Sequence, residues 1–173
     1  YIPLEKIADT VKTFPCVPGR LERIPNSQEL KIYVDFAHTP DALVNVLKCL
    51  KELCTGRLLT LFGCGGDRDP FKRPKMAEAC EQFSDFCIVT TDNPRSEDPL
   101  VIIRQICEGF KSTASHAIEP ERRAAIERII WMATPEDIIL IAGRGHEPYQ
   151  IFAHHTIEFD DRKVARELSH IKS

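Results

Sequence analysis

Four short polar segments each follow an apolar run, and their side chains are suited to binding a small charged molecule. They span residues 35–41 (DFAHTPD), 63–69 (GCGGDRD), 91–95 (TDNPR) and 143–147 (GRGHE). Together they supply carboxylates, guanidinium groups, an amide and glycine-rich backbone. These groups recognise ammonium and carboxylate, which are the two charges of an amino acid.

The 91–95 segment is the most informative of the four. Asp92, Asn93 and Arg95 place an acid, an amide and a guanidinium within four residues. Arg95 could hold a carboxylate through two parallel hydrogen bonds, and Glu147 could help Asp92 to hold an ammonium group. The alternative is purely structural. In it the acid and the amide cap a turn or a helix, and Arg95 pairs at the surface with a neighbouring acid such as Glu97.

The glycines of residues 63–66 allow positive φ and close approach of a ligand to the backbone. Their successive N–H groups could form an anion-binding nest, although a tight turn without a ligand is the alternative. The segment matches neither the dinucleotide fingerprint G-x-G-x-x-G nor the phosphate-binding loop G-x-x-x-x-G-K-[ST]. Arg68 could point either into the site or into solvent. For His38 and His146 the spacing does not separate a site role from core packing.

Apolar runs rich in β-formers alternate with helical patterns along most of the chain. This alternation predicts an α/β fold with a mostly parallel sheet, helices on both faces and a C-terminal antiparallel hairpin that supplies an edge strand. The carboxyl ends of parallel strands share one edge, so the four polar segments should converge there. The expected strands are 31–36, 57–62, 86–90, 116–118, 137–142 and the hairpin 149–152 with 156–159; the expected helices are 4–11, 41–53, 74–83, 100–110, 121–132 and 161–171.

Composition is ordinary for a globular protein: 173 residues, 43% hydrophobic, 28% charged and a formal net charge of −3. Neither nucleic acid nor an anionic membrane is expected as a partner, because the chain carries no excess of positive charge. No apolar run is long enough to span a bilayer. The seven cysteines are an odd number without zinc-ligand spacing. We therefore expect buried reduced thiols, no metal site and a cytoplasmic location.

The four segments, in this order, resemble the C-terminal domain of the Mur ligases, the ATP-dependent amino-acid ligases of peptidoglycan precursor synthesis. Residues 34–41 resemble the family's VDYAHTPD, and residues 62–69 resemble its FGCGGDRD. Residues 143–147 resemble GKGHE, with Arg144 in place of the usual lysine. The likeness covers nearly the whole chain.

The DNPR sequence of residues 92–95 resembles the branch of the family that adds meso-diaminopimelate. Lysine-adding relatives usually have another residue in place of Arg95. The resemblance therefore implies a ligase that joins meso-diaminopimelate to UDP-N-acetylmuramoyl-L-alanyl-D-glutamate through an acyl phosphate. It also implies a Rossmann-like fold for this domain.

In the family, a central domain binds most of the ATP and Mg²⁺, and an N-terminal domain binds the UDP moiety. The prolines and glycine of residues 15–19 are typical of a linker. We therefore expect residues 1–19 to be the end of the central ATPase domain with its linker, and residues 20–173 to be the C-terminal domain. The partners implied are the two other domains, and this chain by itself should be inactive.

The resemblance also assigns residues. Arg95 and Asn93 would hold the distal carboxylate of meso-diaminopimelate, while Asp92, Glu147 and the Gly143 backbone would hold its distal ammonium. No general base is evident, so catalysis would rest on positioning and charge stabilisation. The complete implied set is Arg68, Asp92, Asn93, Pro94, Arg95, Gly143 and Glu147 for meso-diaminopimelate, and Arg20, Asp35 and His38 on the ATP side.

Three other functions stay open at this point. A lysine-adding or folylpolyglutamate-type ligase domain would share the fold, although Arg95 disfavours lysine, which lacks a distal carboxylate. A non-catalytic module that binds nucleotides or amino acids would suit the missing phosphate-binding loop. A dinucleotide-binding domain is disfavoured because the complete glycine fingerprint is absent.

Overall fold

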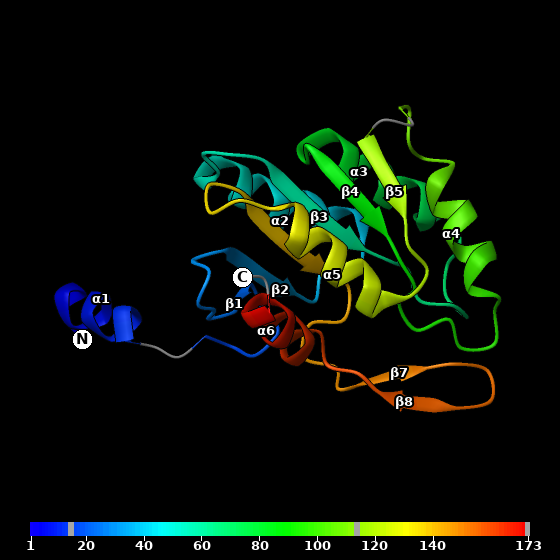
Figure 1. The fold of residues 1–173 in the computed structure, drawn as a ribbon. Helices are drawn as coiled ribbons and strands as arrows, with labels where there is room; N and C mark the ends of the chain where they lie inside the picture. The colour runs from blue at the N-terminus through cyan, green and yellow to red at the C-terminus, as the bar shows by residue number, and fades with distance from the viewer. Residues whose placement is uncertain (14–15, 113–114, 172–173) are drawn as a thin grey trace.

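The computed structural model describes residues 1–13, 16–112 and 115–171, and its main sheet has six strands in the order β1-β2-β6-β3-β4-β5 (Figure 1). Strands β2 to β6 are parallel to their neighbours, and β1 pairs antiparallel with β2. The chain passes from β2 to β3 and later returns to insert β6 between them. The strands are β1 (Glu22–Arg23), β2 (Lys31–Asp35), β3 (Leu58–Phe62), β4 (Phe86–Val89), β5 (His116–Ile118) and β6 (Ile138–Ala142).

Helices cover both faces of this sheet, and one hydrophobic core lies under each layer. Helices α2, α3 and α4 pack on one face, and α5 and α6 pack on the other. Thr39 caps α2 by accepting the Ala42 N–H, and Asp98 caps α4 by accepting the Leu100 N–H. The helices are α1 (Leu4–Thr13), α2 (Pro40–Leu53), α3 (Lys72–Phe83), α4 (Pro99–Cys107), α5 (Arg122–Met132) and α6 (Asp161–Ile171).

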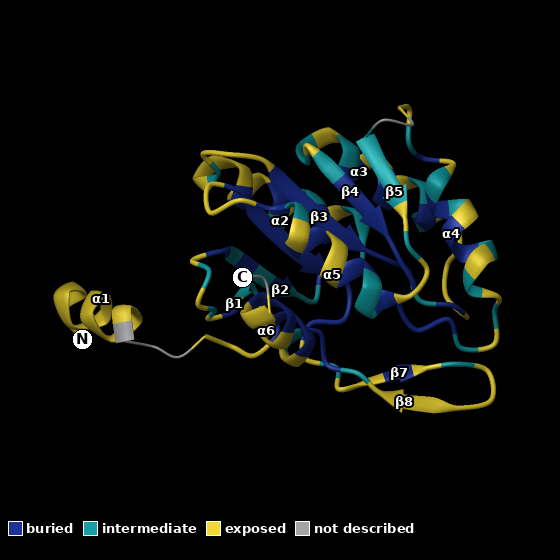
Figure 2. Ribbon diagram, in the orientation of Figure 1, coloured by how far each residue is buried: buried dark blue, intermediate teal, exposed yellow. Residues whose placement is uncertain are grey.

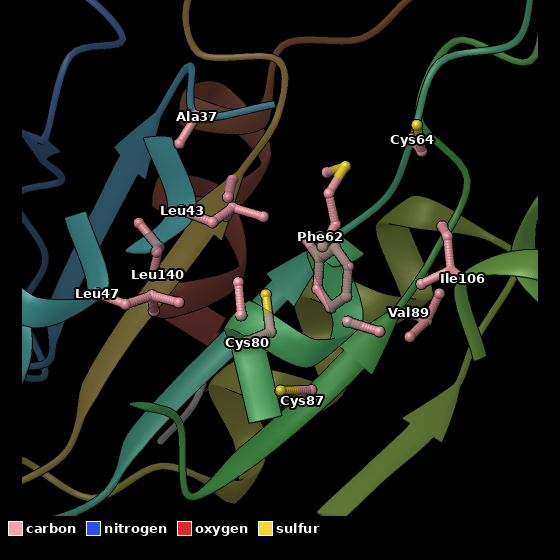
Figure 3. Packing of buried hydrophobic residues seen from close by; sticks show 14 of the residues in the cluster. Ala37, Leu43, Leu47, Phe62, Cys64, Cys80, Cys87, Val89, Ile106 and Leu140 are labelled. Atoms are coloured by element: carbon pink, nitrogen blue, oxygen red, sulfur yellow. The ribbon is translucent and has the colours of Figure 1, made fainter. Parts of the chain in front are cut away.

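The central strands β3 and β6 are buried along their whole length (Figure 2). Successive side chains point to opposite faces, so Phe62 and Leu140 join the core under α2 to α4, while Leu61 and Ile139 join the core under α5 and α6. Figure 3 shows Phe62 and Leu140 among helix residues of the first core. A strand with helices on both sides must be apolar on both faces, which accounts for the unbroken runs LLTLF and IILIA.

All the expected helices and strands are present, with ends that differ by three residues at most, and the C-terminal hairpin is formed by β7 (Tyr149–Ile151) and β8 (Thr156–Glu158). One expectation is wrong, because the hairpin forms a separate two-stranded sheet instead of an edge of the main one. The antiparallel edge strand is β1, which was not predicted. The physical reason is the place of β6: it ends in the middle of the sheet, so the following hairpin emerges among the loops at the carboxyl edge.

The seven cysteines are free thiols in the described structure. Cys64, Cys80 and Cys87 are buried as expected, but Cys16 and Cys49 are exposed. Cys49 lies on the outer face of the amphipathic helix α2, so the expectation of a buried thiol is wrong there.

Helix α1 carries exposed apolar side chains at Leu4, Ile7 and Val11. The expected break of this helix falls partly on Phe14 and Pro15, which lie outside the described residues. None of the helices in the described ranges combines the length and the apolar character that crossing a membrane requires.

Candidate functional site

The carboxyl ends of β2, β3, β4 and β6 surround a pocket of about 250 Å³, so the four polar segments meet as predicted. Each segment contributes at least two side chains or glycines to the wall. This edge is also where the strand order reverses, the usual place for a ligand in an open α/β sheet. The lining residues are Phe36, His38, Gly65, Arg68, Lys72, Asp92, Asn93, Arg95, Gly143 and Glu147.

Most of the residues singled out from the sequence lie in this wall, but Pro94, Arg20, Asp35 and the exposed His146 do not. Pro94 faces a separate small hollow between the 94–99 segment and the hairpin. Phe36 and Lys72 line the pocket and were missed. Phe36 lies in the first segment close to Asp35 and His38, so its position was a usable signal. Lys72 lies among the charged residues of 67–75, and such a charged stretch is usually a solvated surface.

One wall of the pocket is acidic. Asp92 is buried, with 7% exposure, and its Oδ1 accepts the Asn93 N–H at 2.6 Å. Glu147 Oε2 accepts the side-chain amide of Asn93 at 2.7 Å. Within residues 1–13, 16–112 and 115–171, neither carboxylate has a cationic side chain within ion-pair distance. A buried carboxylate without a cation is stabilised by a positively charged ligand.

Gly143 completes the acidic wall, and any side chain at this position would be strained. Its φ is +113°, a conformation that side chains disfavour. A Cβ atom at this position would lie 2.7 Å from Asp92 Oδ2. The glycine therefore lets the backbone of one segment approach the carboxylate of another.

The cations of the same lining, here called the basic wall, are Arg95, Arg68 and Lys72. The Arg95 guanidinium donates to the Gly66 carbonyl at 2.7 Å, and Arg95 has a φ of +53°, which is rare for a residue with a side chain. Its surface alternative is not observed, because Glu97 is bound by both terminal nitrogens of Arg73, each at 2.9 Å. No carboxylate in the described part of the chain forms an ion pair with any of the three cations that line this wall.

The glycine segment serves a different purpose from the one expected. None of Gly63, Gly65 and Gly66 has positive φ, so that expectation is wrong. The Gly66 N–H already donates to the Asn93 carbonyl at 2.9 Å, and a Cβ at Gly66 would lie 1.9 Å from the Pro94 carbonyl oxygen. The glycines here make room for the neighbouring 91–95 segment.

A second corner adjoins the pocket next to Phe36. The Asp35 carboxylate accepts the Leu21 N–H at 2.6 Å and the Ala37 N–H at 2.8 Å, which ties the segment before β1 to the end of β2. The Arg20 guanidinium lies 4.6 Å from the centre of the Phe36 ring. His38 is exposed and packs edge-on against the same ring. Asp35 therefore supports this corner from behind, while the exposed Arg20 and His38 are accessible.

Beneath the pocket lies a buried charge cluster that sequence reasoning did not find. Arg122 donates to both oxygens of Asp161 at 2.8 Å, and both side chains are fully buried. Burial opposes the charge of Arg122, but Asp161 outweighs it and raises the pKa. Arg122 also donates to the carbonyls of Thr91 and Ala142, the residues that precede Asp92 and Gly143. The cluster thus anchors two of the four segments.

Arg144, in the 143–147 segment, also belongs to this cluster. Its Nη2 donates to the carbonyls of Tyr149 at 2.6 Å and Phe159 at 2.9 Å. Its Nε and Nη1 are buried without a hydrogen-bond partner, and Nη1 lies 3.7 Å from Asp161. Burial lowers the pKa of Arg144, and the neighbouring Arg122 lowers it further.

No three His, Cys, Asp or Glu side chains in the part of the chain that the structure describes are grouped to hold a metal ion. No residue of this chain is therefore assigned to Mg²⁺.

Comparison with known proteins adds the following. Residues 19–145 match the family model described as "Mur ligase, glutamate ligase domain". The chain is 49% identical over 165 residues to a UDP-N-acetylmuramoyl-L-alanyl-D-glutamate–2,6-diaminopimelate ligase from Solibacter usitatus, covering 95% of this chain and 33% of the relative. It thus spans about a third of the length of the curated relatives it matches.

Two solved structures extend the comparison. A structure of a UDP-N-acetylmuramoyl-L-alanyl-D-glutamate–2,6-diaminopimelate ligase superposes with a TM-score of 0.83 at 38% identity, covering 97% of this chain and 34% of the other. A folylpolyglutamate synthase/dihydrofolate synthase from Yersinia pestis, complexed with AMPPNP and Mn ion, has a TM-score of 0.59 at 17% identity and covers 89% of this chain and 31% of the other. The second likeness is one of fold alone.

Proposed function

The chain belongs to the Mur ligase family, and from this we propose that it is the amino-acid-binding domain of a ligase that adds meso-diaminopimelate to UDP-N-acetylmuramoyl-L-alanyl-D-glutamate. The relatives with that name support the choice of substrate. One observation carries it: a single pocket is lined by three cations and by two carboxylates, none of which forms an ion pair with a described residue. A ligand that brings both an ammonium and a carboxylate satisfies both walls.

The far end of meso-diaminopimelate carries these two groups on one carbon. Asp92, Glu147 and the Gly143 backbone bind the ammonium, since the two carboxylates and the glycine share one wall. Arg95 binds the carboxylate, helped by the N–H of Asn93 that Glu147 does not use. Arg68 adds a second guanidinium at the exposed rim, and Pro94 fixes the turn between the binding residues.

Held in this way, the amino acid presents its other amine to an activated acyl group. In the proposed reaction, the γ-phosphoryl group of ATP moves to the side-chain carboxylate of D-glutamate and gives an acyl phosphate and ADP. The amine then forms the C–N bond, the acyl C–O bond breaks, and inorganic phosphate and a proton leave. The contribution of this chain is orientation, which can supply several kcal/mol of a barrier.

The corner formed by Arg20, Phe36 and His38 faces the ATP side, with Asp35 holding it in place. Other domains of the ligase would bind Mg²⁺, most of the ATP and the UDP-dipeptide. Within such a ligase, residues 1–19 are the end of the central domain with its linker, and residues 20–173 are the C-terminal domain.

The rival substrate is lysine, which has the distal ammonium but no distal carboxylate. It would leave Arg95 without a counterion in the described pocket, so the geometry favours diaminopimelate. The test is steady-state kcat/KM for meso-diaminopimelate and for lysine, measured with the complete ligase. Strong preference for meso-diaminopimelate supports the proposal, and equal use of the two amino acids contradicts it.

A further inference from the structure

We propose that Gln150, in the β7–β8 hairpin, is a positioning residue that fixes the 92–95 segment and thereby sets the preference for an amino acid with a second carboxylate. The identity of that amino acid rests on the proposed function. Gln150 does not line the pocket, so it acts through the segment and not on the ligand.

The hairpin is exposed almost everywhere except at this side chain. Every residue of β8 is exposed, and Tyr149 and Ile151 on either side of Gln150 are exposed as well. Gln150 itself has 3% exposure. A glutamine is rarely buried unless its amide has partners, so its burial in an exposed hairpin points to a specific contact.

That contact is with the backbone of the pocket segment. The Gln150 Nε2 donates to the Asp92 carbonyl at 2.7 Å and to the Thr91 carbonyl at 3.4 Å. Next along β7, the Ile151 N–H donates to Asn93 Oδ1 at 2.9 Å, and the Ile151 carbonyl accepts the Arg95 N–H at 3.0 Å. The 92–95 segment is thus bonded to β7 from one end to the other.

The hairpin is itself held at its base. The buried Arg144 donates to the carbonyls of Tyr149 and Phe159, which lie at the two ends of the hairpin, and the Phe159 N–H donates to the Pro148 carbonyl. The hairpin therefore links the buried charge cluster to the pocket segment, with Gln150 as its buried side-chain contact.

Arg95 is the residue that needs such support. Its backbone is in the left-handed region, which costs energy for a residue with a side chain. Without the Gln150 amide, the Asp92 carbonyl loses a buried donor, and the segment can relax toward a conformation in which Arg95 no longer faces the pocket. The contact to the distal carboxylate then weakens more than the contacts to the distal ammonium.

The test uses Gln150→Leu and Gln150→Glu in the complete ligase. Gln150→Leu should raise KM for meso-diaminopimelate about tenfold with kcat changed less than about threefold, because it weakens binding and not the chemical step. KM for lysine should change less, so the preference between the two falls. Gln150→Glu should raise KM for meso-diaminopimelate more than Gln150→Leu does, because its carboxylate faces two carbonyl oxygens. Gln82→Leu, at an exposed glutamine of α3, is the matched control and should behave as wild type.

Hydrogen exchange supplies a readout that needs no ligand. The Arg95 amide should exchange about tenfold faster in Gln150→Leu than in wild type, while amides of β3 and β6 keep their rates. An unchanged exchange rate of the Arg95 amide overturns the inference, and so does an equal rise in KM for the two amino acids. If the wild-type ligase shows no preference for meso-diaminopimelate, the proposed function fails instead, and the Arg95 exchange rate alone decides whether Gln150 fixes the segment.

Discussion

The side-chain amide of Asn93 donates to Glu147 Oε2 at 2.7 Å and so joins two segments of the pocket lining that are 54 positions apart in the sequence. Its other end, Oδ1, accepts the Ile151 N–H at 2.9 Å. Asn93 is therefore held on both sides, and it fixes the orientation of a carboxylate that the proposed ligand needs. The amide thus prepares the acidic wall as well as offering a donor to the ligand.

Replacing Asn93 by Asp should expose this role. The new Oδ atoms can still accept the Ile151 N–H, but a carboxylate would face Glu147 and repel it. We expect KM for meso-diaminopimelate to rise by about 10- to 100-fold, and the defect to shrink as the pH is lowered, because one protonated carboxyl can then donate to the other. Steady-state kinetics across pH provide the measurement. A defect that does not depend on pH would argue against an Asn93–Glu147 contact.

Replacing Arg20 should affect the ATP side of the site and leave the amino-acid side unchanged. Its guanidinium lies over the Phe36 ring outside the amino-acid pocket, in the corner proposed to face ATP. In the complete ligase, Arg20→Ala should lower kcat by about tenfold or more and change KM for meso-diaminopimelate by less than about twofold. Arg23→Ala removes an exposed charge of the neighbouring β1 and serves as control. An unchanged kcat in Arg20→Ala would make Arg20 an ordinary surface residue.

Arg144 allows a prediction on stability. Arg144→Lys should change the free energy of unfolding by less than about 1 kcal/mol, since it removes the two nitrogens that lack hydrogen-bond partners and keeps a donor toward the hairpin carbonyls. Arg144→Met should cost about 2–4 kcal/mol, because the carbonyls of Tyr149 and Phe159 then lose their donor. Urea unfolding of the two variants checks this order. An equal loss of unfolding free energy in the two variants would mean that the volume of the side chain matters and its hydrogen bonds to the two carbonyls do not.

Much of this site could be predicted from the sequence, because strand periodicity and turn residues are local signals. The unbroken apolar runs of β3 and β6 predicted two strands, and the polar residues after them located the pocket. The hairpin was predicted as an element but not in its place. Strand order depends on which distant segments pair, and no local pattern encodes the insertion of β6 between β2 and β3.

The buried ion pair of Arg122 and Asp161 could not be predicted from the sequence for the same reason. Arg122 and Asp161 are each surrounded by polar residues in the sequence, and such residues are normally solvated. Their pairing across 39 positions makes their burial possible, and only the tertiary structure brings them together. Gln150 is similar: an amide in a short exposed hairpin gives no sign that it reaches the backbone of another segment.

Asp137 predicts how stability depends on pH. Burial by itself would raise its pKa, but hydrogen bonds from the Arg57 side chain and from the backbone of Arg57 and Thr134 lower it from 3.8 to about 2. The unfolded chain therefore binds the proton more readily. The contribution to stability is present above about pH 4, amounts to about 2 kcal/mol, and is lost as the pH falls toward 2.

In Asp137→Asn the free energy of unfolding at pH 7 should fall by about 2 kcal/mol, and the difference from wild type should disappear near pH 2. Urea unfolding between pH 7 and pH 2 measures both quantities. Glu167→Gln breaks an exposed ion pair with Arg123 and is the control, because solvent screens such a pair; its free energy of unfolding should follow that of wild type at every pH. A gap between wild type and Asp137→Asn that persists at pH 2 would show that the carboxylate charge is not its source.

We expect Arg95 to decide the choice between meso-diaminopimelate and lysine. Its guanidinium lines the pocket, and in the described ranges it has a carbonyl partner but no carboxylate. Removing one partner of a desolvated charge pair costs about 2–5 kcal/mol. At about 1.4 kcal/mol per factor of ten, this corresponds to a loss of about 30-fold to several thousand-fold in kcat/KM for meso-diaminopimelate in Arg95→Ala. The kcat/KM for lysine, which makes no such contact, should change little. The ratio of kcat/KM for meso-diaminopimelate to kcat/KM for lysine should therefore fall steeply.

Arg95→Lys separates charge from geometry at the same position. An ammonium can attract the distal carboxylate but cannot make two parallel hydrogen bonds to it, so activity should return only in part. Ser96→Ala, at the exposed next residue, controls for changes in the segment that spare the guanidinium. The measurement is kcat/KM for both amino acids in all three variants. If Arg95→Ala keeps the wild-type preference, the distal carboxylate is recognised by another cation of the same wall, and Arg68 and Lys72 become the residues to replace next, because they complete that wall.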